Sequence, residues 1–189
     1  NVMIIDIDED SLRAEGRWPW SREKMGALVT ALKAAGVHTI GFDVAFAEAE
    51  RNVAEELINA ASESGTIEHL DYLKQLIPQM DRDLAFSRKL EGQNVVLGFL
   101  LHSEGDESVG ALPSPWSAIT AEQRDILTLP MMSSYTGNMA LLQKAAAHGG
   151  FLNTTKDADG VLRSTPLILG NNDMIYPSLS LAMARRYTK

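Results

Sequence analysis

The chain opens with a nearly continuous apolar run, residues 2–7, which is the pattern of a strand buried on both faces. Ser21 suits a helix N-cap, and apolar residues then recur at helical spacing until Gly36, a residue that favours the left-handed stop of a helix. Residues 37–44 have the pattern of a second strand. Strand, helix and strand together predict a βαβ unit, whose strands are parallel and joined by a right-handed crossover.

Residues 51–91 carry a helical pattern. Pro78 interrupts it, so we expect a kink or two abutting helices, the second capped by Asp81. The apolar positions form one predicted stripe, made of Leu70, Leu73, Ile77, Met80 and Leu84. Residues 94–101 predict a third buried strand, whereas residues 103–137 show weak periodicity, as functional or mobile insertions do.

Residues 138–147 predict a short helix. Two further strands are expected at 151–154 and 161–169, joined by a turn at Asp159 and Gly160.

A second turn at 171–173 and a short strand at 175–176 lead to a closing helix that Pro177 or Ser178 opens. The predicted fold is therefore α/β: a mixed sheet with a parallel βαβ core, helices on both faces and a C-terminal antiparallel hairpin.

Composition narrows the function classes. With 189 residues, one domain spanning 1–189 is expected, large enough for its own core. The formal net charge is −8 and no Lys/Arg-rich run occurs, which argues against nucleic acid and anionic lipid as partners. The chain has no cysteine and no apolar run long enough to span a membrane. It starts on a predicted strand and stops inside a predicted helix, so we expect a segment of a longer protein.

Carboxylates gather where the first two predicted strands end, and Asp6, Asp8 and Asp43 are the central members. They could bind a cation or accept hydrogen bonds from an amine ligand. Alternatively, Asp6 and Asp43 accept from nearby backbone N–H groups while the others are solvated. A metal-dependent hydrolase or transferase built on these three residues is one hypothesis for function.

A Trp-Pro-Trp corner precedes the first predicted helix. Trp18, Pro19, Trp20 and Arg22 could line a pocket for an anionic or planar small molecule. The alternative is a packed corner in which Arg22 pairs with a local carboxylate. Trp20 and Met25 have the spacing of a hydrophobic staple, so we interpret Trp20 as structural and Trp18 as the better ligand candidate.

Motifs of catalysis and metal binding are missing from the sequence. A calcium loop aligned on Asp157 and Asp159 places Pro166 where a bidentate Glu is required, and a tight turn explains those residues better. The four histidines have no ligand-like spacing, and no nucleophile elbow, zincin motif or Walker loop is found. We therefore expect neither a metal site nor a cofactor, and a domain that is not itself an enzyme.

Several motifs in order resemble the type-two CHASE domain. They are Asp6-Ile7-Asp8-Glu9-Asp10-Ser11-Leu12, Gly16-Arg17-Trp18-Pro19-Trp20-Ser21-Arg22, Gly41-Phe42-Asp43-Val44, Asp83-Leu84-Ala85, Gly150-Phe151-Leu152-Asn153, Asp157-Ala158-Asp159-Gly160 and Tyr176-Pro177-Ser178-Leu179. The resemblance implies an extracytoplasmic sensor of a bacterial receptor, on the periplasmic or extracellular face of the membrane and flanked by transmembrane helices. The implied output is an adenylate or guanylate cyclase, a diguanylate cyclase, a histidine kinase or a Ser/Thr kinase, and among these we expect an adenylate or guanylate cyclase.

The resemblance carries neither a catalytic residue nor a common ligand. We expect an unknown small-molecule or ionic signal and a homodimer, because the outputs work as pairs. A dimerisation module that binds no ligand is the remaining hypothesis.

Overall fold

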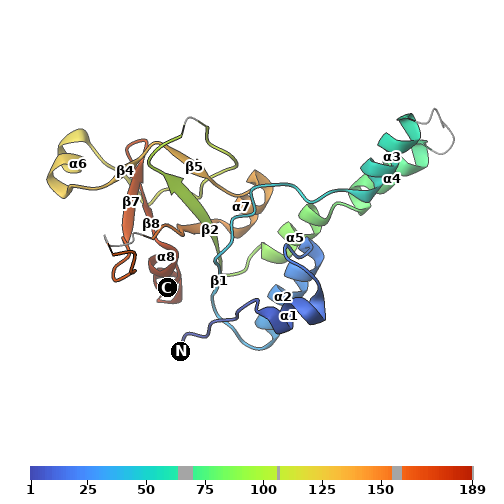
Figure 1. Ribbon diagram of the computed structural model, residues 1–189, viewed down its shortest axis with the longest axis horizontal. Coiled ribbons are helices and arrows are strands. Elements are labelled where there is room, and N and C mark those ends of the chain that lie inside the picture. The colour runs from blue at the N-terminus through green and yellow to red at the C-terminus, as the bar shows by residue number, and fades with distance from the viewer. Residues whose placement is uncertain (64–69, 106, 155–158, 189) are drawn as a thin grey trace.

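The computed structural model describes residues 1–63, 70–105, 107–154 and 159–188. Among these residues, strands form two four-stranded sheets (Figure 1). In the first sheet, β2 (Val95–His102) pairs in parallel with β1 (Ile40–Phe42) and with β6 (His148–Phe151). The far end of β2 pairs antiparallel with β5 (Ser134–Thr136). The mixed sheet with a parallel core is therefore confirmed.

Helices cover both faces of the first sheet. One face packs against α2 (Arg22–Ala34), α5 (Arg82–Leu90) and α7 (Ala140–Ala146). The core cluster there consists of Met25, Val29, Ile40, Phe42, Phe46, Phe86, Leu90, Val95, Leu97, Leu142 and Ala146. The opposite face packs against α8 (Leu179–Tyr187). A Cβ at Gly41 would lie 2.1 Å from the sulfur of Met183, so α8 approaches the sheet closely.

The chemistry of its ends defines α2. Ser21 Oγ accepts from the N–H of Lys24 at 3.3 Å, which confirms the predicted N-cap. Trp20 packs against the core cluster that contains Met25, as the staple requires. Gly36 follows the helix at φ +81°, where a residue with a Cβ would be strained.

The predicted strand at residues 2–7 is wrong. These residues pair with no strand, and Val2, Met3 and Ile4 are 85–92% exposed. The first element is α1 (Glu9–Glu15), which Asp8 caps. The run has the apolar composition of a buried strand, but a strand forms only where a neighbouring strand hydrogen-bonds its backbone N–H and C=O groups. The parallel neighbour of β1 is instead β2, so the predicted βαβ unit is right in kind and wrong in its strands.

Residues 53–63 and 70–79 form a helical arm rather than a layer on the sheet. It consists of α3 (Val53–Glu63), α4 (Leu70–Leu76) and the short 3-10 helix η1 (Ile77–Gln79), and Figure 1 shows α3 and α4 projecting away from the sheets.

The break at Pro78 and the Asp81 cap, which accepts from Leu84 N at 2.8 Å, are confirmed. The predicted stripe is not a buried face, since none of its members is buried and Met80 is exposed. Because a new helix begins after Asp81, the apolar stripe of residues 70–80 does not continue along α5. Phe86 and Leu90 lie on the face of α5 that enters the core.

The second sheet contains β3 (Ser117–Ala118), β8 (Met174–Pro177), β7 (Ile168–Asn171) and β4 (Met131–Met132), in that order. Its buried side chains meet the end of β2 in a second cluster of Phe99, Leu101, Phe151, Leu169 and Tyr176. The weakly periodic segment 103–137 thus provides β3, α6 (Ala121–Leu127), β4 and β5.

The C-terminal antiparallel hairpin exists, but its turn differs from the predicted one. β7 and β8 are joined at Asn172 and Asp173, both at positive φ. The hairpin expected between 151–154 and 161–169 is wrong, because Phe151 pairs with β2 and β7 pairs with β8 and β4. Asp159 and Gly160 still form a turn, while residues 155–158 lie outside the described residues.

The closing helix begins as predicted: Ser178 Oγ accepts from the N–H of Leu181 at 3.3 Å. In the described part of the chain, none of the helices combines the length and apolarity needed to cross a membrane.

Candidate functional site

The carboxyl ends of the parallel strands form the candidate site. Open α/β sheets bind ligands in the crevice beyond these ends. Asp43 follows β1, and Asn153 and Thr154 follow β6. The structure places two neighbouring pockets there, and both are lined by Asn153 and Thr154.

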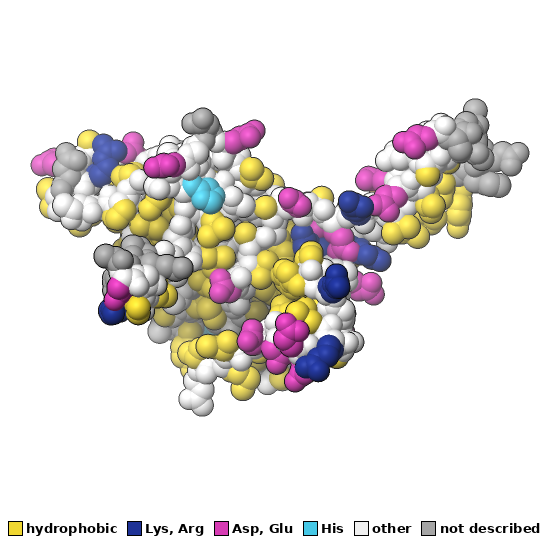
Figure 2. All heavy atoms as spheres, viewed as in Figure 1, with side chains coloured by type: hydrophobic (Ala, Val, Ile, Leu, Met, Phe, Trp, Pro, Cys, Tyr) yellow, Lys and Arg dark blue, Asp and Glu magenta, His cyan; other side chains and the backbone are white. Residues whose placement is uncertain are grey.

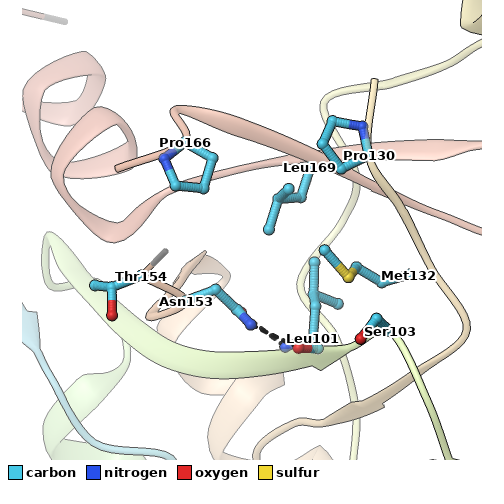
Figure 3. A pocket seen from close by; sticks show the side chains of 8 residues that line it. All are labelled: Leu101, Ser103, Pro130, Met132, Asn153, Thr154, Pro166 and Leu169. Carbon is cyan, nitrogen blue, oxygen red and sulfur yellow. Dashed lines mark hydrogen bonds between the residues drawn. The ribbon is translucent and has the colours of Figure 1, made fainter. Parts of the chain in front are cut away.

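The first pocket lies between the end of β2 and the second sheet. Figure 3 shows Leu101, Ser103, Asn153 and Thr154 on one side and Pro130, Pro166 and Leu169 across the gap. Its volume of about 190 Å³ is below the range for drug-sized ligands, so it suits an ion or a small metabolite.

Asn153 shapes this pocket by acting as a substitute strand neighbour. Its Oδ1 accepts from Leu101 N at 2.9 Å, and its Nδ2 donates to Leu101 O at 2.6 Å (Figure 3). The side chain thereby continues the pairing of β6 with β2 by one more residue. It holds the pocket floor in place, and its orientation is fixed before any ligand arrives.

The second pocket, of about 210 Å³, lies between the end of β1 and the start of α8. Its polar lining is one carboxylate, one amide and four hydroxyls: Asp43, Asn153, Thr154, Thr165, Ser178 and Ser180. Phe151, Leu152 and Leu179 supply the apolar part. Asp43 is exposed and makes no hydrogen bond or ion pair with any described residue. The pocket therefore presents a free negative charge beside hydroxyl groups.

Arg22 lies in a different environment, a buried clamp with Asp83, Glu50 and Arg82. Its Nε pairs with Asp83 Oδ1 at 2.8 Å, and the two side chains are only 11% and 6% exposed. Its Nη2 donates to the carbonyl of Glu48 at 2.7 Å. The guanidinium also covers the ring of Phe46, 4.7 Å from the centroid. This arrangement matches the packed-corner alternative for Arg22.

Glu50 closes the clamp. Its carboxylate accepts from Arg22 N at 2.5 Å and pairs with Arg82 at 2.7 Å. Its own N–H donates to Asp83 Oδ2 at 2.7 Å. The hydrogen bond from Arg82 to Glu50 raises the pKa of that guanidinium further above its usual range. The clamp joins the starts of α2 and α5 to the loop that leads into the arm.

The two tryptophans of the Trp-Pro-Trp corner lie in different environments. Trp20 donates from Nε1 to Gly16 O at 2.8 Å and carries Lys24 over its ring. Trp18, on the other side of a cis Trp18–Pro19 bond, is 40% exposed, with its ring 6.2 Å from that of Trp20. Trp18 lines neither pocket among the described residues.

The three central carboxylates of the sequence analysis do not meet. Asp8 accepts from Ser11 N and Oγ at 2.8 and 2.7 Å, and these hydrogen bonds lower the pKa of Asp8. Asp6 is exposed on the N-terminal segment, and Asp43 lines the second pocket. Among described residues, no three His, Asp or Glu side chains come together as metal ligands would. The metal-dependent enzyme hypothesis therefore loses the cluster on which it depends.

Sequence reasoning missed several residues that position the site. Asn138 is fully buried, accepting from Phe46 N at 2.7 Å and donating to Gly98 O at 3.0 Å. Glu50 and Asp83 were not assigned to Arg22. The sequence indicated that Arg22 would pair with a carboxylate, but it did not indicate which carboxylate.

Comparison with known proteins gives one positive finding. A family model described as "CHASE2 domain" matches residues 1–189, the whole chain. No curated protein and no solved structure matches the chain.

Proposed function

The chain belongs to the CHASE2 family of extracytoplasmic sensor domains of signalling proteins, and we propose that it detects a small polar signal at the ends of β1 and β6 and controls a cytoplasmic adenylate or guanylate cyclase. The observation that carries the ligand site is the pair of pockets sharing Asn153 and Thr154. No bond is made or broken in this function. The ligand binds the pocket more tightly in one conformation of the receptor than in the other, and this difference in affinity shifts the population of the two conformations.

The lining of the second pocket supports a ligand class. Asp43 attracts a positive charge or accepts from a hydroxyl, and the hydroxyls beside it both donate and accept. A compact amine, amino alcohol or polyol satisfies these groups. An inorganic anion would be repelled by Asp43, and the small volume of about 210 Å³ favours a compact ligand.

The position of α8 supports a route for the signal. Ser178 and Leu179 line the second pocket where the helix begins, and the helix ends at Tyr187. A Cβ at Gly150 would lie 2.4 Å from Leu179 Cα, so helix and sheet are in close contact. Closely packed elements shift as units. A ligand that draws the start of α8 toward Asp43 would move the far end of the helix as well.

A thermal-shift screen of amines, amino alcohols and polyols tests the ligand class. A compound that binds the native state raises the melting temperature with increasing concentration. We expect the shift to disappear in Asp43→Asn and to persist in Asp6→Asn, the matched exposed carboxylate outside the pocket. The pocket assignment is contradicted if no compound shifts the melting temperature, or if both variants keep the full shift.

The cyclase coupling needs the full-length receptor in membranes. The active compound should change cyclic-nucleotide synthesis in the wild type and have no effect in the Asp43→Asn receptor. Unchanged synthesis after deletion of this domain would rule out the sensory role.

A further inference from the structure

Residues 2–5 form the most exposed apolar surface among the described residues. Val2, Met3, Ile4 and Ile5 are 92, 85, 88 and 52% exposed, and they follow one another in a segment that is neither helix nor strand. Figure 2 shows hydrophobic atoms along the lower margin, where the N-terminal segment runs in Figure 1. Single exposed apolar residues are common in soluble domains, but four contiguous large ones indicate a contact surface.

The outer edge of β1 is open. Ile40 N donates to Asn94 O at 2.9 Å, on the side of β2. Because alternate residues of a strand present their N–H and C=O groups to opposite edges, Gly41 faces away from β2. Among the described strands, none pairs with that edge. Met183 packs on the face of Gly41 where a side chain would be, and the N–H and C=O of Gly41 are the backbone groups that point to the unpaired edge.

We propose that residues 2–7 of one copy add as a strand to the β1 edge of a second copy, reciprocally, in an antiparallel direction. An unpaired edge and an exposed apolar segment are the two halves of strand addition. Each copy carries both halves, so a two-fold dimer satisfies both edges at once. The proposal supplies the surface for the homodimer that the family suggests, and it rests on the proposed function only for the purpose of that dimer in signalling.

Charge selects the direction of the added strand. At the amino end of β1, Lys33 Nζ donates to His38 O at 3.5 Å. At the carboxyl end stands Asp43. An antiparallel strand places the acidic end of the segment, beginning at Asp6, at the end of β1 where Lys33 lies. A parallel strand would place Asp6 beside Asp43, and like charges opposite one another destabilise a strand pair.

Direction in turn selects the second copy over the same chain. Through α1 and α2, residues 2–7 are joined to β1 by the kind of helical connection that parallel strands use, and parallel pairing would set Asp6 beside Asp43. The structure accordingly leaves residues 2–7 off their own sheet. A strand from another molecule has no such restriction.

Cysteine cross-linking tests this geometry, because the chain contains no native cysteine. Val2 and Met3 of the added strand point to opposite faces, so one of them lies on the same face as residue 43. Asp43→Cys combined with either Val2→Cys or Met3→Cys should therefore give a disulfide-linked dimer on mild oxidation. Asp43→Cys combined with Ile7→Cys should not. A monomer with an internal disulfide, or a dimer formed best with Ile7→Cys, overturns the proposal. So does the absence of any disulfide in the Val2 and Met3 pairs.

A matched pair of surface substitutions gives an independent readout in solution. Ile4 and Ile126 are 88% and 74% exposed in one copy, so neither Ile4→Asp nor Ile126→Asp should unfold the protein. We expect Ile4→Asp to weaken self-association at least about tenfold in sedimentation equilibrium, the effect of losing one buried isoleucine, and Ile126→Asp to leave it unchanged. A wild type that stays monomeric at its highest soluble concentration, or equal effects of both variants, overturns the proposal.

The thermal shift by ligand is measured on the same variants. Loss of association with the ligand shift retained in Ile4→Asp is the result expected here. If no compound shifts the melting temperature of the wild type, that result contradicts the proposed function and leaves the proposed dimer unaffected.

Discussion

The clamp around Arg22 and the pocket around Asp43 both lie beyond the carboxyl end of β1, yet they treat charge in opposite ways. In the clamp, Arg22 and Asp83 are nearly buried and every charged group has a partner at 2.5–2.8 Å. In the pocket, Asp43 is exposed and contacts no described polar group. A saturated cluster cannot bind a ligand without losing its own bonds, whereas an unpaired carboxylate beside hydroxyls can. The difference separates a structural region from a recognition region.

The two regions are also connected. The clamp holds the loop of residues 43–52, and Asp43 is the first residue of that loop. Met139 N donates to Phe46 O, and Asn138 accepts from Phe46 N, which pins the middle of the loop to α7. The hydrogen bonds of the loop thus hold in place the segment that carries the exposed Asp43 carboxylate.

Removing one half of the clamp should have the largest effect. Arg22→Gln leaves Asp83 and Glu50 buried with less compensation, and we expect the free energy of unfolding to fall by about 3 kcal/mol, as for other broken buried pairs. Chemical denaturation measures this loss. Arg22→Met combined with Asp83→Leu removes both charges and should recover part of it. A double variant as unstable as the sum of the two single variants would show that the pair is not coupled.

Asn153 tests the boundary between the two regions. Asn153→Ala leaves Leu101 N and O without their partner and should cost about 1–3 kcal/mol. Thr154→Val, the neighbouring exposed position in both pockets, should change stability by less than about 0.5 kcal/mol. Hydrogen exchange at the Leu101 amide localises the effect. Equal stabilities of both variants would mean that Asn153 is not a substitute strand neighbour.

Asp43 in the pocket and Glu50 in the clamp allow the two regions to be compared by removing one carboxylate from each. Without ligand, Asp43→Asn should alter unfolding by less than about 0.5 kcal/mol, because the carboxylate is exposed and unpaired. Glu50→Gln weakens hydrogen bonds to Arg22 and Arg82 and should cost about 1–2 kcal/mol, discounted for the partial exposure of Arg82. Denaturant titrations of both variants in one buffer decide this. A larger loss for Asp43→Asn would reverse the assignment of the two regions.

Local chemistry made helix ends predictable from the sequence. Ser21, Asp81 and Ser178 cap helices where expected, and Gly36 ends one, because each acts through bonds to residues only a few positions away. Strand partners were not predictable in the same way. An apolar run such as residues 2–7 has the same pattern whether it pairs within a chain, between chains or not at all.

The candidate site was predictable in part for the same reason. Asp43 could be placed at a strand end from its position after an apolar run, and it lines a pocket there. The partners of Arg22 could not, since Asp83 is 61 positions away and joins it only through the packing of α5 on α2. The role of Asn153 depends equally on a neighbour 52 positions away. Long-range contacts of this kind depend on the whole fold.

The smallest effect concerns an exposed counterpart of the clamp, the pair of Asp159 and Arg163. Arg163 donates to both oxygens of Asp159 at 2.9 and 2.8 Å, and Val161 N adds a third bond. The bonds from Arg163 are the main reason that the pKa of Asp159 lies below its ordinary value. Because the pKa of Asp159 is lower in the folded state, the pair stabilises the turn fully at pH values above the ordinary pKa. This stabilisation is lost as the pH falls through the lowered pKa of the folded state.

An NMR titration of the Asp159 carboxyl measures this pKa directly. Arg163→Gln should move it up toward the ordinary value, while the pKa of Asp8, lowered by hydrogen bonds from Ser11, should not change. Global stability should hardly respond, since water screens both members of an exposed pair. Bonds as short as those of the clamp thus stabilise little when solvent surrounds them, so burial rather than bond length makes the clamp structural. If Arg163→Gln destabilised the fold as much as Arg22→Gln, that distinction would fail.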